Sequence, residues 1–75
     1  MNNITQEELE FVYYKRGTAG SFRTGLYDLF FKGDSINQYK LETMYPELGV
    51  LRRYSTEAGY WEDLQKRFKF NFSSE

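Results

Sequence analysis

Apolar residues recur along this chain at the three- and four-residue spacings typical of amphipathic α-helices. Glycines and a single proline interrupt this pattern and divide it into segments. The connections between segments are short, which favours a compact all-α bundle of four to five short helices. We expect helices at 6–16, from 18 or 21 to 32, from 34 or 35 to 45, from 46 to a turn at 57–59, and at about 60–69.

The first segment has clear start and stop signals. Thr5 is a good N-cap, and Glu8 three residues later completes a capping box. Glutamates early in the helix and Lys15 late in it complement the helix dipole, and Gly17 ends the helix. The expected buried stripe is Leu9, Val12, Tyr13 and Arg16.

The second segment carries an apolar stripe that should face the core. Gly33 ends this helix, and Gly25 lies inside it, where glycine costs about 1 kcal/mol relative to alanine. We therefore expect another helix to cross closely at Gly25. The stripe consists of Phe22, Leu26, Leu29 and Phe30.

The third and fourth helices meet at the proline. Asp34 or Ser35 caps the third helix. Tyr45 ends it, because the residue before a proline avoids the α region, and Pro46 suits the first turn of the fourth helix. The expected buried residues are Ile36, Tyr39 and Met44 with Leu41 at their flank, followed by Val50, Leu51 and Tyr54.

The fifth helix places Trp61, Leu64 and Phe68 on one face. Phenylalanines then alternate with polar residues over 68–72, which predicts an extended aromatic tail at 70–75 rather than more helix. The core of the bundle is expected around Phe22, Leu26, Phe30, Ile36, Leu51, Trp61 and Leu64.

Composition narrows the class of protein. A chain of 75 residues is enough for one domain, 1–75. Seven Phe, seven Tyr and one Trp, with a net charge of −1, indicate a folded chain. The lack of cysteine excludes disulfides and thiolate zinc sites. No apolar run approaches the roughly 18 residues of a membrane span, and Met1–Asn3 does not begin a signal peptide, so we expect no membrane association.

Residues suited to catalysis are scarce. The chain has no histidine, the usual acid–base group at neutral pH, and no serine or threonine is paired with a base in a known motif. The segment 17–24 lacks the lysine of a phosphate-binding loop, and 34–37 lacks the alternating ligands of a calcium loop. We therefore expect a protein that is not an enzyme and that holds no metal or cofactor.

Dibasic doublets keep nucleic-acid binding open as an alternative. A basic surface interleaved with aromatic rings is how proteins hold single strands. The net charge of −1 and the pI near 5.4 argue against it, and the helix dipole already accounts for basic residues near helix C-termini. Lys66 and Arg67 also have acidic partners within their helix. The candidate residues for this alternative are Arg52, Arg53, Lys66 and Arg67.

Some aromatic residues do not lie on the expected core stripes. Arg23 stands at the positive end of the second helix, and Tyr27 and Phe31 follow it at four-residue spacing. Phe11 and Tyr14 are off the stripe of the first helix in the same way. Burial of the second helix on two sides is the first explanation. The second is an exposed patch in which these five residues bind a partner, since aromatic and arginine side chains dominate interface hot spots.

Three short motifs carry a resemblance to known proteins. They are Gly20–Phe22, Tyr45–Glu47 and Gly59–Glu62, read as Gly-Ser-Phe, Tyr-Pro-Glu and Gly-Tyr-Trp-Glu. Together with the residues between them, over about 17–65, they resemble small proteins of unknown function from bacterial prophages and other mobile elements. The resemblance implies a mobile-element origin and a location in the cytoplasm of a bacterial host.

The expected function is that of a non-enzymatic protein-binding module that inhibits or modulates a host protein. The partner's identity is open. One alternative is the small nucleic-acid-binding protein described above. The other is a structural phage protein that forms homo-oligomers, for which the aromatic tail at 70–75 would supply the contact.

Overall fold

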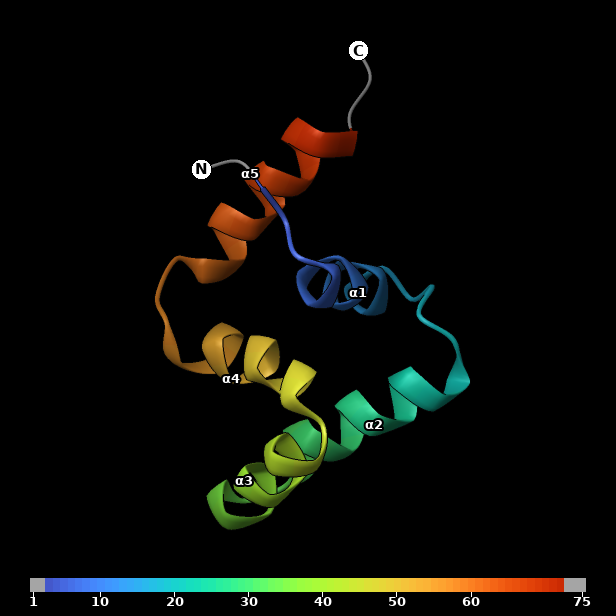
Figure 1. Ribbon diagram of the computed structural model, residues 1–75, viewed down its shortest axis with the longest axis vertical. Helices are drawn as coiled ribbons and strands as arrows, with labels where there is room; N and C mark the ends of the chain where they lie inside the picture. Colours follow the sequence, from blue (N-terminus) through green and yellow to red (C-terminus); the bar gives the residue numbers. More distant parts are fainter. Residues whose placement is uncertain (1–2, 73–75) are drawn as a thin grey trace.

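The computed structural model describes residues 3–72, and in that range the chain is all-α. Figure 1 shows α1 at the centre, with α5 on one side of it and α2 and α4 on the other, while α3 lies outermost beside α2. The all-α class and the five-helix bundle are therefore confirmed. The elements are α1 (Gln6–Lys15), α2 (Ser21–Lys32), α3 (Ser35–Met44), a 3₁₀ turn η1 (Pro46–Leu48), α4 (Gly49–Thr56) and α5 (Tyr60–Phe72).

Local sequence signals set most of the helix ends. The hydroxyl of Thr5 accepts a hydrogen bond from the backbone N–H of Glu8, whose carboxylate accepts one from the Thr5 N–H, so the capping box is confirmed. Asp34 caps α3 by accepting from the N–H of Asn37 at 2.9 Å. Gly17 and Gly20 adopt φ values of 81° and 86° in the turn between α1 and α2.

The core lies between α1, α2, α4 and α5, and Phe11 is at its centre. The Phe11 ring is fully buried and lies 5.1 Å from the ring of Tyr54 and 5.6 Å from that of Trp61, in edge-to-face geometry. Bulky rings thus supply the volume for which the chain has few aliphatic residues. The buried apolar residues are Phe11, Val12, Leu26, Tyr27, Phe30, Leu48, Val50, Leu51, Tyr60 and Leu64.

The expectation of an exposed aromatic patch is wrong for two of its residues. Phe11 and Tyr27 are both 0 % exposed. Tyr14 and Phe31 are partly buried and pack against the core. The physical reason is that α2 presents Tyr27 and Phe31 to α1, so the side of α2 expected to bind a partner is an inner face.

The opposite side of α2 and most of α3 are exposed, contrary to the sequence-based core. Phe22 is 71 % exposed and Leu29 55 %, and no residue of α3 is buried. The cause is the position of α3, which packs against α2 and η1 at the edge of the molecule. The other residues expected to be buried but found exposed are Tyr13, Ile36, Tyr39 and Met44, at 39–74 %, and Arg16.

The prediction of an extended tail is wrong over 70–72, because α5 continues as a helix through Phe72. A single extended segment leaves its backbone groups without a partner strand, whereas a helix pairs them internally. The side chain of Phe68 packs partly buried against the core, which anchors this last part of α5. Residues 73–75 of the expected tail lie outside the described range.

Candidate docking face on α2 and α3

An apolar groove runs between α2 and α3 on the outer side of the molecule. It has a volume of about 540 Å³, and most of the surface that lines it is apolar. Its α2 wall is the exposed stripe that was expected to be core. The groove is lined by Ser21, Phe22, Gly25, Leu26, Leu29, Leu41, Met44 and Tyr45.

Gly25 leaves a gap in the middle of this stripe. A Cβ placed on Gly25 would meet nothing within 4 Å, so no helix of the described part of the chain crosses there and the predicted close crossing is wrong. Phe22 and Leu29 stand one turn before and after the gap. An apolar stripe with a missing side chain at its centre allows another backbone to approach closely.

The groove continues into a second hollow of about 410 Å³ that shares Leu29 and Leu41 and ends at Lys32 and Lys40. Among the residues that the structure describes, no acidic one lines either hollow. Within residues 3–72 neither lysine is in an ion pair. At the other end, near Ser21, α2 begins without a side-chain cap and with no acidic residue in its first turn. Both ends of the face are thus suited to negatively charged groups.

Arg23, which the sequence singled out as misplaced, ties three elements together. Its guanidinium lies 2.8 Å from a carboxylate oxygen of Glu10 on α1 and 4.0 Å from Glu47 on η1. It also donates to the hydroxyl of Tyr27 at 3.2 Å, a bond that raises the pKa of Arg23. These partners account for Arg23 at the start of α2 and lessen the need for an external partner at this residue.

Tyr14 also has an internal partner. Its hydroxyl donates to a carboxylate oxygen of Asp28 at 2.5 Å, which links α1 to α2. Burial and this bond together raise the pKa of Tyr14 to about 12. The candidate partner-binding residues from the sequence therefore lie together at the α1–α2 contact, and they hold that contact.

Most of the candidate nucleic-acid residues are paired within the chain. Arg52 lies 3.0 Å from Glu42, Arg53 lies 3.2 Å from Glu57, and Arg67 lies 2.7 Å from Glu8. Lys66 is exposed. Guanidinium groups that already bind carboxylates have fewer N–H donors left for phosphates, so this set forms a weaker anion-binding surface than its sequence indicates.

Sequence reasoning missed a buried polar cluster around Glu8. Glu8 is only 3 % exposed. Its carboxylate accepts hydrogen bonds from Nη1 and Nη2 of Arg67 and, at 2.6 Å, from the Tyr60 hydroxyl. Burial raises the pKa of the Glu8 carboxyl, but the bonds from Arg67, Tyr60 and the Thr5 N–H outweigh burial and lower it to about 2. The cluster fastens α1 to α5. The capping box gave the only sequence signal for Glu8.

The part of the chain that the structure describes contains no group of three or more acidic, His or Cys residues able to hold a metal ion. None of its helices is long and apolar enough to cross a membrane. Every buried side-chain nitrogen or oxygen in that range has a hydrogen-bond partner.

Comparison with known proteins found no match. No protein family, no curated protein and no solved structure is similar to this chain.

Proposed function

We propose that this protein is a non-enzymatic binding module whose outer α2–α3 face docks an amphipathic helix of another protein. The observation that carries the proposal is the exposure of Phe22, Leu29 and Met44 around one apolar groove. Contiguous exposed apolar surface of this kind is typical of interaction sites on soluble domains. The resemblance of the sequence to prophage proteins supports a bacterial host protein as the partner, which the module would inhibit or modulate.

The charges around the face favour a particular occupant. A helix lying along the groove would place its ends near Ser21 at one side and near Lys32 and Lys40 at the other. Asp or Glu at both ends of its apolar stripe would complement the free N–H groups of α2 and the two ammonium groups. A second copy of this chain fits less well, because an antiparallel pair of α2 helices would bring Lys32 toward the positive N-terminus of its partner.

The proposal is tested by capture from the host lysate with two matched double variants. Phe22→Ser/Leu29→Ser removes both apolar anchors, whereas Tyr13→Ser/Ile36→Ser removes exposed apolar side chains that line neither hollow. Burying one such side chain contributes about 1.5–3 kcal/mol, so loss of both should weaken partner binding at least about a hundredfold. Circular dichroism should show both variants folded.

We expect the wild type and the Tyr13/Ile36 variant to bind the same partner through a segment that is apolar on one side and acidic at its ends. Lys32→Glu/Lys40→Glu should weaken that complex. A partner that stays bound to the Phe22/Leu29 variant contradicts the proposal. So does a wild-type protein that is a dimer by light scattering while the Phe22/Leu29 variant is a monomer.

A further inference from the structure

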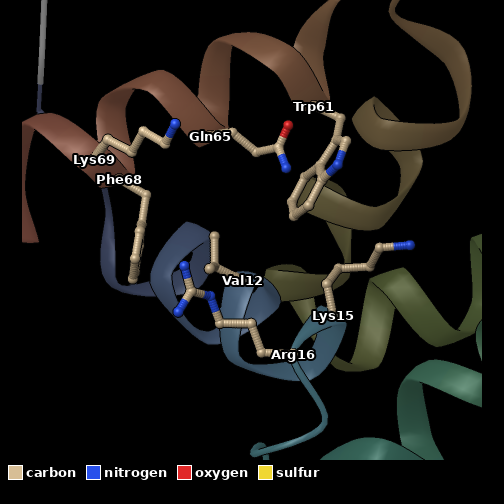
Figure 2. A pocket seen from close by; sticks show the side chains of 7 residues that line it. All are labelled: Val12, Lys15, Arg16, Trp61, Gln65, Phe68 and Lys69. Atoms are coloured by element: carbon tan, nitrogen blue, oxygen red, sulfur yellow. The ribbon is translucent and has the colours of Figure 1, made fainter. Parts of the chain in front are cut away.

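A second groove, between α1 and α5, combines aromatic walls with a basic rim. Figure 2 shows the rings of Trp61 and Phe68 at its two ends, with Val12 and Gln65 between them. The groove has a volume of about 260 Å³ and lies apart from the α2–α3 face. Its basic side chains are Lys15, Arg16 and Lys69, and none of the acidic residues within 3–72 lines it. In a chain of net charge −1, this is a local concentration of positive charge.

Two of the basic side chains, Arg16 and Lys15, lie against aromatic rings, and the Lys15 ammonium also donates to the Tyr54 hydroxyl at 3.2 Å. The Arg16 guanidinium carbon lies 4.5 Å from the centre of the Phe68 ring, and the Lys15 nitrogen lies 5.7 Å from that of Trp61. A guanidinium stacked by its face keeps its N–H groups at the edge for an anion. Within residues 3–72 Arg16 makes no hydrogen bond through its side chain and no ion pair.

The aromatic walls and the size of the groove narrow the class of anion. The indole of Trp61 beside an apolar floor at Val12 favours a planar ring, which stacks on the indole face. A volume of about 260 Å³ is near the lower end for ligand sites, which suits one base and not a run of bases. Arg16 at the end of α1 and Lys69 on α5 reach the Phe68 end, and Figure 2 shows the nitrogen atoms of both on the groove side of the ring.

We propose that the α1–α5 groove binds one nucleotide, with the base against Trp61 and the phosphate between Arg16 and Lys69. The nucleotide is either free in solution or a single residue of an unpaired strand, since both offer the same base and phosphate. This site uses different residues from the docking face and from the paired arginines Arg52, Arg53 and Arg67. The test of this site is therefore independent of the test of the proposed function.

Trp61 is the only tryptophan in the chain, so its fluorescence reports on this groove alone. The full-length protein is titrated with adenosine monophosphate and, separately, with a short oligothymidylate at low salt. We expect saturable quenching as the base stacks on the indole. Saturation by the mononucleotide indicates a free nucleotide as the ligand, and saturation by the oligonucleotide alone indicates a strand.

Two variants and a matched control locate the site. Arg16→Gln should raise the dissociation constant about tenfold, since a bidentate phosphate contact is lost, and Lys69→Gln about three- to fivefold. Lys66→Gln removes the same charge from the same helix outside the groove and should change the constant less than twofold. Far-UV circular dichroism checks that all three variants are folded.

The proposal is overturned if neither ligand quenches Trp61 at millimolar concentration. It is also overturned if Arg16→Gln and Lys69→Gln bind as tightly as the wild type, or if Lys66→Gln weakens binding as much as Lys69→Gln does. That last outcome would indicate that binding depends on the overall charge of the protein and not on contacts within the groove.

Discussion

Replacing Phe11 by alanine is expected to unfold most of the domain at room temperature. The ring is 0 % exposed and contacts the rings of Tyr14, Tyr27, Tyr54 and Trp61. Truncating a buried phenylalanine costs about 3–5 kcal/mol, through lost burial and the cavity left behind. A domain of this size has a total stability of about the same magnitude. Urea denaturation followed by circular dichroism measures the loss.

Tyr13→Ala is the matched control for Phe11→Ala. It removes an aromatic ring from the same helix, two residues further along, where the side chain is 39 % exposed. Its free energy of unfolding should fall by less than about 1 kcal/mol. If Phe11→Ala lowers the free energy of unfolding no more than Tyr13→Ala does, Phe11 is not part of the core. The sequence-based interpretation of Phe11 as a partner-binding residue would then regain support.

Lowering the pH is expected to reduce the free energy of unfolding, because the carboxylate of Glu8 becomes protonated. The folded-state pKa of Glu8, about 2, lies below the ordinary value of 4.5 that applies in the unfolded chain. A depressed carboxyl pKa contributes stability that is present in full above about pH 4.5 and is lost as the pH falls toward 2. This difference in pKa corresponds to about 3 kcal/mol for so buried a side chain. Urea midpoints measured between pH 7 and pH 2 follow the loss.

Glu8→Gln isolates this contribution from those of the other carboxylates. The variant keeps the shape of the side chain but has no charge for Arg67, so at neutral pH it should be about 3 kcal/mol less stable than the wild type. An osmolyte can keep both proteins folded for the comparison. The difference should shrink toward zero near pH 2, where Glu8 of the wild type is protonated. A difference that does not change with pH contradicts the assignment.

The ends of the helices could be predicted because the signals for them are local. These signals act within a few residues of the chain, through backbone hydrogen bonds and steric limits. They are the pairs Thr5–Glu8, Asp34–Asn37 and Tyr45–Pro46. The start of the fourth helix, predicted at Pro46, was an exception, because Pro46–Leu48 form a 3₁₀ turn and α4 begins at Gly49. The end of α5 was another. There the alternating pattern of 68–72 was read as extended, although a helix needs no second strand to pair its backbone.

The buried faces were harder to predict, and α2 shows why. It carries apolar residues around most of its circumference, so periodicity cannot tell which side another helix will cover. The structure covers Tyr27 and Phe30 and leaves Phe22 and Leu29 exposed. The Glu8–Arg67 pair was beyond sequence reasoning for a related reason, because its residues lie 59 positions apart and only the packing of α1 on α5 brings them together.

The same ambiguity bears on function. The pattern of Phe22, Leu29 and Met44 is that of buried residues, yet nothing in the described range 3–72 buries them. Exposed apolar surface of this extent favours aggregation unless it is covered. A partner helix across the face would cover it and would also account for glycine at Gly25, which weakens α2 without easing any contact inside the monomer.

The most direct test of the docking face is the dissociation constant of the captured partner for two Gly25 variants, measured by calorimetry. A Cβ at Gly25 meets nothing within 4 Å and the position is exposed, so Gly25→Trp should fold like the wild type while its indole fills the gap in the stripe. Gly25→Ala should raise the free energy of unfolding by up to about 1 kcal/mol and should still bind. We expect Gly25→Trp to lose binding, and an affinity for the partner equal to that of the wild type would rule out the docking face.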